Sequence, residues 1–566
     1  INTNNLYGAP AAMMMWYNFY RYLTGHLSFA RKVALEGVSR GGLYVYGWAE
    51  RNPDKVSCIY AEAPVCDIKS WPGGKGNGKG DARSWQELQR VFGFNEAQAM
   101  AYKGNPIDDL QGLAAFKVPV LHVIGLNDHI VPPDENTFIL VQKYEKLGGP
   151  AYVYPMTRGP RQLEGHHFTI EHPGWWADFI FKHSFPVQTP IPYENYFRPR
   201  EGIPSALEKF EHQKTGTVAF LGGSITFNPG WRDMVIRYLG EQFPDTKFRF
   251  ISAGIPSLGS LPHAFRVQRD VLDSAKVDLM FVEAAVNDRV NGTDSLTQLR
   301  SLEGIVRHAR KSNPRMDIVL MSFAGPDKLK DYSEGRMPAE IENHELVAEH
   351  YHLPSINMAG EVYDKIKAGE FSWQYDFKNL HPAAYGQQLY FQTIKSLLWR
   401  CMDEAERKDA SVTADYAMPM PLDKWNFDQG QYFSIRDARV RKGWNLVTRW
   451  QPESGAHTRP GFVDCPMLVA TQPGAALDLP FSGTAIGMAV VSGSDAGVVR
   501  YRVDHGPTRT IDLYTQWSRS LYLPWYVLFE GALKPGKHVL HLTLTADHNP
   551  RSTGTACYIE YFLLNR

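Results

Sequence analysis

Two stretches of the chain alternate short apolar strands with amphipathic helices, and this alternation limits the chain to few architectures. In residues 1–184 the strand-like segments are KVALEG, SCIYAEAP, VPVLHVIG and AYVYPM. In residues 201–408 they are TVAFLGG, FRFISAG, DLMFVEAAV and DIVLMS, with LPSINM as a fifth candidate. Strands that alternate with helices predict parallel sheets covered by helices, so we expect two α/β domains.

The pattern changes after residue 415. Helical periodicity fades, and short strands such as LVTRW, AIGMAVV, VVRYRVD and HVLHLTLTA alternate with Gly, Pro and Asp turns. This spacing is typical of an all-β sandwich. Residues 185–200 contain four prolines and no regular period, which indicates a linker. The predicted domains are therefore 1–184, 201–408 and 415–566.

The composition narrows the classes of partner. The formal net charge is +0, which argues against a nucleic acid or an anionic membrane surface as partner. The sequence contains no run of 18 apolar residues, so we expect no membrane span. The five cysteines have no metal-site spacing, so we expect no metal and no cofactor. We expect the cysteines to be free, buried thiols, although a disulfide between Cys465 and Cys557 is left open. A cleaved segment upstream of residue 1 is also left open.

The first strand-to-helix turn, GVSRG at 37–41, places Ser39 directly after a strand. Asp128 follows the strand VPVLHVIG, and His166 precedes the last helical segment of this domain. Nucleophile, acid and histidine in this order resemble the α/β-hydrolase superfamily over residues 5–183. The resemblance implies that Ser39 is a nucleophile, Asp128 its acid and His166 its base.

This first domain departs from the family because only 38 residues precede Ser39. The strands that normally come before the nucleophile, and the loop with the second oxyanion donor, are not in this sequence. Two interpretations stay open: further residues lie upstream, or the domain is a partial fold kept as a scaffold. In the second interpretation Asp128 is a loop residue and His166 makes local hydrogen bonds only.

The second turn, GGSIT at 222–226, places Ser224 at the carboxyl end of a strand. Open α/β sheets bind ligands at that edge. Gly254 follows the next strand, Asn287 follows the third, and His381 stands just before the last helix. A serine, a histidine and backbone or amide N–H donors are the groups that acyl transfer requires.

These four blocks resemble the SGNH (GDSL-like) hydrolases over residues 215–400, which implies an α/β/α sandwich. The resemblance implies that Ser224 is nucleophile and first oxyanion donor, that Gly254 and Asn287 complete the oxyanion hole, and that His381 is the base. The third block departs slightly, with Ala285 in place of the usual glycine.

The acid of the triad is the larger departure, because Lys378 occupies its usual position, three residues before the histidine. Asp376 is the nearest substitute, while a backbone carbonyl, Asp288 or Glu283 are alternatives. Trp231 and Arg232, shortly after the nucleophile, either line a substrate cleft or, in the case of Trp231, belong to the core.

The last domain is similar to the jelly-roll carbohydrate-binding modules of polysaccharide esterases. Trp517, Trp525 and Tyr526 either stack on sugar rings or fill the sandwich core. The whole arrangement resembles SGNH carbohydrate esterases close to the family-20 type.

This resemblance implies a serine esterase that removes O-acetyl groups from a plant polysaccharide or its oligosaccharides, of xyloglucan or xylan type. It also implies a periplasmic or secreted location, and a homo-oligomer is left open. Two alternatives remain. In one, Ser39 is a second active site; in the other, the chain is a non-catalytic glycan-binding protein.

Overall fold

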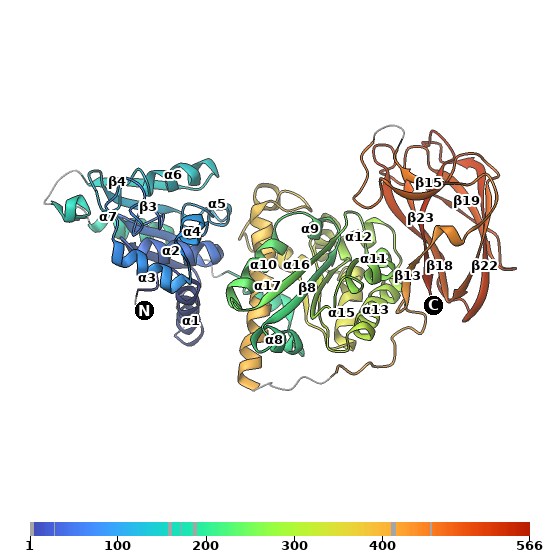
Figure 1. Cartoon of the computed structure of the whole chain (residues 1–566), viewed down its shortest axis with the longest axis horizontal. Helices are drawn as coiled ribbons and strands as arrows, with labels where there is room; N and C mark the ends of the chain where they lie inside the picture. The colour runs from blue at the N-terminus through green and yellow to red at the C-terminus, as the bar shows by residue number, and fades with distance from the viewer. Residues whose placement is uncertain are drawn as a thin grey trace. The chain divides into compact units, whose positions relative to one another are not determined.

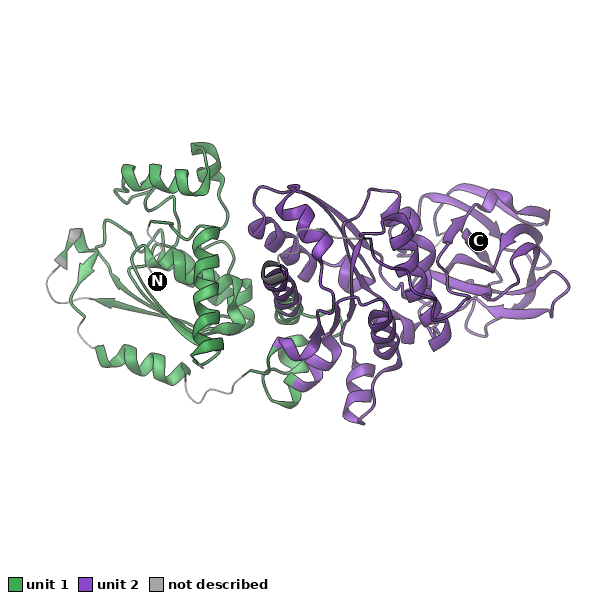
Figure 2. Cartoon of the chain, turned by 90° about the horizontal axis from the view of Figure 1, so that it is seen from below, with its two compact units in different colours: residues 1–192, 365–392 green, residues 193–364, 393–566 purple. Residues whose placement is uncertain are grey.

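The computed structural model describes residues 5–27, 29–156, 161–170, 173–184, 190–408, 415–452 and 456–566. The chain forms two compact units, coloured separately in Figure 2. Unit 1 comprises residues 1–192 and 365–392, and unit 2 comprises residues 193–364 and 393–566. The helix α17 (Ala384–Lys408) contributes residues to both groups.

Unit 1 is built on a parallel sheet of four strands, which confirms the predicted α/β class (Figure 1). The order is β1 (Val33–Val38), β2 (Val56–Glu62), β3 (Val120–Gly125) and β4 (Ala151–Met156). All six residues of β3 are buried, as expected for a central parallel strand. Among the described strands β1 is one edge of the sheet, and Ser39 follows directly after it.

The helices of unit 1 occupy the connections between these strands and the segments that flank them. They are α1 (Pro10–His26), α2 (Gly41–Arg51), α3 (Ala82–Phe92), α4 (Glu96–Ala101), α5 (Gln111–Ala115), α6 (Thr137–Lys146) and α7 (Pro173–Ser184). A short hairpin, β5 (Arg161–Gln162) and β6 (His167–Phe168), flanks His166.

The first sheet of unit 2 has six strands and matches the second predicted α/β domain. Their order is β7 (Phe197–Arg198), β12 (Ser355–Asn357), β11 (Asp317–Ser322), β10 (Leu279–Glu283), β8 (Thr215–Gly222) and β9 (Lys247–Gly254). All neighbours run parallel except β7, which is antiparallel to β12.

The strand β7 lies within the segment 185–200 that the prolines indicated as a linker. Residues 185–189 lie outside the described part of the chain, whereas Tyr196 and Phe197 are buried. Burial of these two aromatic rings explains why the end of this segment joins the sheet. The prolines fix the backbone but do not prevent a short edge strand.

Helices cover the six-stranded sheet. They are α8 (Pro204–Glu211), α9 (Ser224–Phe227), α10 (Trp231–Gln242), α11 (Ser260–Val267), α12 (Ala285–Val290), α13 (Ser295–Ser312), α14 (Pro326–Ser333), α15 (Ala339–His350) and α16 (Met358–Lys367). None of the described helices is long and apolar enough to cross a membrane.

The C-terminal part of unit 2 is a sandwich of two antiparallel sheets, which confirms the predicted all-β domain. One sheet has the order β15 (Asn445–Trp450), β16 (Cys465–Ala470), β23 (Cys557–Asn565), β18 (Ala485–Ser492) and β21 (Leu523–Glu530), with β13 (Gly430–Phe433) also paired to β23. The other has the order β14 (Arg439–Lys442), β17 (Ala476–Gly483), β22 (Gly536–His548), β19 (Gly497–Val503) and β20 (Arg509–Asp512). One apolar core lies between them, and Cys465 and Cys557 are free thiols.

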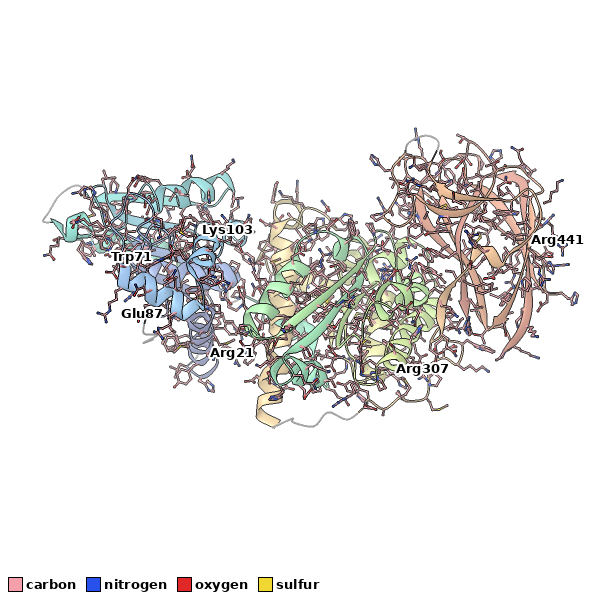
Figure 3. All side chains as sticks on the ribbon, in the orientation of Figure 1. Arg21, Trp71, Glu87, Lys103, Arg307 and Arg441 are labelled. Carbon is pink, nitrogen blue, oxygen red and sulfur yellow. The ribbon has the colours of Figure 1, made fainter. Side chains whose placement is uncertain are left out.

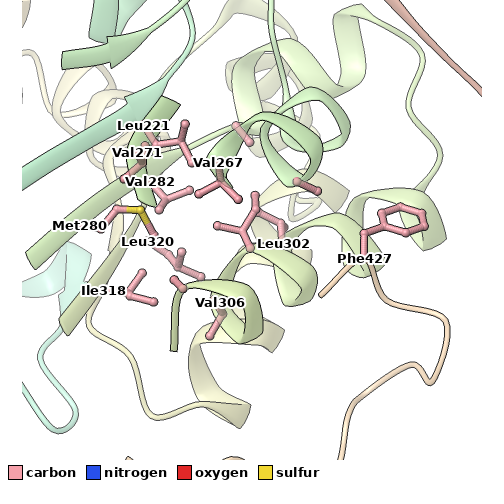
Figure 4. Packing of buried hydrophobic residues seen from close by; sticks show 14 of the residues in the cluster. Leu221, Val267, Val271, Met280, Val282, Leu302, Val306, Ile318, Leu320 and Phe427 are labelled. Carbon is pink, nitrogen blue, oxygen red and sulfur yellow. The ribbon is translucent and has the colours of Figure 1, made fainter. Parts of the chain in front are cut away.

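The sandwich and the six-stranded sheet's helices share a hydrophobic core. Phe427, Ala489 and Leu563 belong to the same buried cluster as Leu302 of α13, part of which Figure 4 shows. Arg307, labelled in Figure 3, donates a hydrogen bond of 2.8 Å to the carbonyl oxygen of Pro419. The two domains of unit 2 are therefore packed against each other.

Gly304 of α13 lies at a close approach in this shared core, and it provides a test of the packing. A Cβ added there would lie 2.7 Å from the backbone carbon of Phe427. We expect Gly304→Ala to destabilise unit 2 by about 1–3 kcal/mol, measured by thermal unfolding, because the neighbouring backbone cannot move freely. Gly240→Ala on the exposed side of α10, where a Cβ meets nothing within 4 Å, is the control. Equal unfolding temperatures for both variants would contradict the shared core.

Candidate active sites

Ser39 occupies a sharp turn between β1 and α2. Its φ of +52° lies in the left-handed region, which non-glycine residues rarely adopt and which is often found at functional sites. The turn is held by hydrogen bonds: Ser39 N–H donates to Glu62 O at 2.8 Å, and Val65 N–H donates to Ser39 O at 2.9 Å. This is the strained strand-to-helix turn that the GVSRG motif predicts.

His166 and Asp128 complete a hydrogen-bonded chain with Ser39. His166 Nε2 lies 2.8 Å from Ser39 Oγ, and His166 Nδ1 lies 2.7 Å from Asp128 Oδ2. The His166 and Asp128 side chains are only 4% and 1% exposed. Asp128 Oδ1 also accepts hydrogen bonds from the backbone N–H groups of Ile130 and Val131, which fix the carboxylate.

This arrangement has the geometry of a Ser–His–Asp triad. The carboxylate holds the imidazole so that Nε2 faces the serine hydroxyl and can take its proton. The backbone N–H of Arg40, at the start of α2, is the oxyanion donor that an α/β-hydrolase fold uses at this place. The structure therefore brings together the three residues predicted for the first site. Their catalytic role stays a prediction.

Ser224, Gly254 and Asn287 lie at the carboxyl ends of three neighbouring strands in unit 2. Ser224 begins α9 directly after β8, Gly254 is the last residue of β9, and Asn287 lies in α12 just after β10. β8 is the middle strand of the three, and Gly222 and Gly254 are paired in register. A Cβ added to Gly223 would lie 2.3 Å from Asn287 Nδ2, so the Asn287 amide is held against the turn that carries Ser224.

A buried polar layer lies beneath these strand ends. Asp288 Oδ1 accepts hydrogen bonds from Ser260 N–H at 2.7 Å and from the Ser260 hydroxyl at 2.9 Å. Glu283 Oε1 accepts from Val286 N–H at 3.0 Å. Burial raises the pKa of each carboxyl group to about 7. Both groups, named above as alternative acids, hold the loop after β10 and the start of α11.

His381 and Asp376 belong to the 365–392 segment of unit 1, before α17. The backbone N–H of His381 donates to Asn379 Oδ1 at 2.7 Å, and its side chain is exposed. Asp376 lies in the turn η5 (Trp373–Phe377), and its Oδ2 accepts from Ser372 N–H at 2.8 Å. The pairing of Ser224 with His381, and the identity of the acid, remain predictions.

Trp231 and Arg232 differ in burial: Trp231 is fully buried, whereas Arg232 is partly exposed. Trp231 is 0% exposed and packs against Phe220, Phe281 and Phe323. The cleft interpretation is therefore wrong for Trp231, because a fully buried ring offers no surface to a substrate. The Arg232 guanidinium donates to Thr226 O at 2.8 Å, which supports the end of α9.

The three aromatic residues considered for sugar stacking, Trp517, Trp525 and Tyr526, are each partly buried. The rings of Trp517 and Trp525 lie 6.1 Å apart, and Trp525 packs against the sandwich core. Tyr526 packs against the core that the sandwich shares with α11 and α13. Stacking on sugar rings therefore stays a proposal for the Trp517–Trp525 pair. Tyr526 lies in the interface between the two domains of unit 2.

Comparisons with known families agree with this division of the chain. Residues 220–389 match the GDSL-like lipase/acylhydrolase family, and residues 19–161 match the prolyl oligopeptidase family. The second α/β domain is therefore a GDSL-like hydrolase domain, and the first is α/β-hydrolase-like. These matches confirm both resemblances inferred from the motifs and make the chain a carboxylic ester hydrolase.

Solved structures show the same fold. A two-domain esterase (CEX) active on acetylated mannans has 22% identity and a TM-score of 0.54, with 66% of this chain and 98% of that chain covered. The same esterase co-crystallised with mannopentaose gives 21% identity, a TM-score of 0.53 and the same coverage. At these identities the likeness establishes the fold alone. No curated protein matched the chain in sequence.

The contact between Gly223 and Asn287 gives a test of the Ser224 site. We expect Gly223→Ala to lower kcat of Ser224-dependent ester hydrolysis by about 10²–10³-fold, because the new methyl group displaces one oxyanion donor. Thermal unfolding should change little, and Gly240→Ala should keep wild-type kcat. A Gly223→Ala enzyme with unchanged kcat would show that the Asn287 amide takes no part in the reaction.

Proposed function

We propose that this chain removes O-acetyl groups from an acetylated polysaccharide or its oligosaccharides at Ser224. The observation that carries the proposal is the convergence of Ser224, Gly254 and Asn287 on three adjacent strand ends, within a GDSL-like acylhydrolase domain. Ser224 is partly exposed, as a nucleophile must be, while the surrounding polar layer is buried.

The proposed reaction proceeds through an acyl-enzyme. Ser224 Oγ attacks the acetyl carbonyl carbon, and His381 accepts the hydroxyl proton. The backbone N–H groups of Ser224 and Gly254 and the Asn287 amide stabilise the tetrahedral oxyanion. The bond to the sugar oxygen breaks, and that oxygen takes the proton from His381. Water then hydrolyses the acetyl-serine by the same steps, which releases acetate and restores Ser224.

The acetylated-glycan substrate is supported by two independent features. The structural relative with the same fold is an esterase active on acetylated mannans. In this chain, Ile255 packs against an aromatic cluster of the sandwich that includes Trp450, Phe462 and Tyr522. Because Ile255 directly follows Gly254, the sandwich borders the proposed oxyanion hole. Xyloglucan or xylan as the natural glycan, a jelly-roll topology for the sandwich, and a periplasmic or secreted location are part of this proposal.

A second candidate activity is ester hydrolysis at Ser39. The hydrogen bonds that link Ser39, His166 and Asp128 favour it. Ser39, His166 and Asp128 meet at 2.8 Å and 2.7 Å without any rearrangement of the chain. The proposal is a two-site esterase, in which Ser39 hydrolyses a second ester. A scaffold role for unit 1 would require no such geometry.

Acetate release by single and double serine variants tests the main proposal. We expect Ser224→Ala to lower acetate release from acetylated mannan, xylan or xyloglucan by at least about 10³-fold, since the nucleophile is lost. Ser39→Ala should keep this activity. The glycan that is deacetylated fastest identifies the substrate class. Full activity in Ser224→Ala, with loss in Ser39→Ala, would contradict the assignment of the main site.

Covalent labelling tests whether both serines are activated. We expect a fluorophosphonate probe to label Ser224 and Ser39, as located by peptide mass spectrometry. Asp128→Asn should slow labelling of Ser39 by at least about 10²-fold, because the imidazole then loses its orienting carboxylate. Asp178→Asn, on the exposed face of α7, is the control for unit 1. If neither serine is labelled, a glycan-binding protein without catalysis is favoured.

A further inference from the structure

Arg266 is a charged side chain buried beneath the Ser224 site. It lies on α11, is 0% exposed, and makes four hydrogen bonds or ion pairs. Nη2 donates to Ala253 O at 2.6 Å and to Gly222 O at 3.1 Å. Nη1 pairs with Asp270 at 2.8 Å, and Nε donates to His263 Nδ1 at 3.1 Å. A fully buried guanidinium is costly unless each such contact is made.

The carbonyl of Ala253 belongs to the same peptide unit as the N–H of Gly254. This peptide is planar, and the one cis bond among the described residues is Trp71–Pro72. The C=O and N–H of a trans peptide point in opposite directions. When Arg266 holds Ala253 O, it fixes this peptide unit at the end of β9, beside β8. The link to Gly222 O ties the end of β8, just before Ser224, to the same guanidinium.

His263 extends this arrangement to the third strand. Its Nδ1 accepts from Arg266, so the ring proton is on Nε2, which lies 3.2 Å from Glu283 O at the end of β10. Burial, together with the Arg266 charge, holds the pKa of His263 well below its usual value, which keeps the ring neutral. Arg266 and His263 thus connect the carboxyl ends of β8, β9 and β10.

We propose that Arg266 is a positioning residue of the esterase, which aligns the three strand ends that carry the proposed oxyanion hole. Arg266 itself has no exposed surface and acts only through these backbone groups. The inference rests on the proposed function, because it requires Ser224 and Gly254 to form the reacting site.

The test compares Arg266→Lys and Arg266→Met in a Ser39→Ala background, with p-nitrophenyl acetate as substrate. Lys keeps a positive charge but not the forked donors, and Met removes both. We expect kcat to fall by about 10-fold or more for Lys and by about 10²-fold for Met, with KM nearly unchanged, because the lost interaction acts on the transition state.

Arg310→Met is the matched control. Arg310 is also buried, donates to Tyr351 O at 3.3 Å and lies over the Tyr416 ring, but it touches none of the strand ends of the site. We expect Arg310→Met to lower the unfolding temperature while keeping kcat. Arg266→Lys provides the kinetic comparison if Arg266→Met fails to fold.

Two outcomes would overturn the inference, and they differ. If Ser224→Ala abolishes hydrolysis but both Arg266 variants keep kcat, Arg266 has a structural role only. If Ser224→Ala in the same background keeps activity, the proposed function fails, and the inference fails with it. A fall in kcat for the Arg266 variants, alongside unchanged kcat in Arg310→Met, supports the inference.

Discussion

The parallel strands β8 and β9 end in register with each other, and the Ser224 site depends on this constraint. Gly222 and Gly254 are paired in register, so the chain turns away from both strands at the same height. Ser224 and Gly254 are adjacent for this reason, and β10 on the other side of β8 brings Asn287 to the same edge. The three groups come from distant parts of the sequence, yet the sheet fixes their spacing before any substrate binds.

Rigid support around this edge comes from two directions. Below the strand ends, Asp288 holds the start of α11, and Arg266 on that helix returns to the carbonyl groups of β8 and β9. Beside them, the sandwich domain shares a core with α11 and α13 and contacts Ile255. A domain packed in this way is held at a fixed angle to the hydrolase domain.

The local sequence was sufficient to predict where the site residues lie. Strand, glycine and serine signals are short-range, and they placed Ser39, Ser224, Gly254 and Asn287 at strand ends where the structure has them. The class of each domain followed from periodicity for the same reason. Packing between residues far apart in the sequence was harder to predict. Trp231 follows the nucleophile so closely that a cleft position was plausible, but its ring fills the core between the sheet and α10.

Arg266 was not predicted at all, because HAFRVQR resembles an ordinary amphipathic helix in which an arginine faces solvent. Only the burial of the whole helix between the sheet and the sandwich shows that Arg266 faces the strand ends. The central claim, that Ser224 is the acetyl acceptor, is tested most directly by mass spectrometry of the enzyme after rapid acid quench during turnover of an acetylated glycan. The account predicts an acetyl group on the peptide that contains Ser224. Acetylation of the Ser39 peptide alone would contradict it.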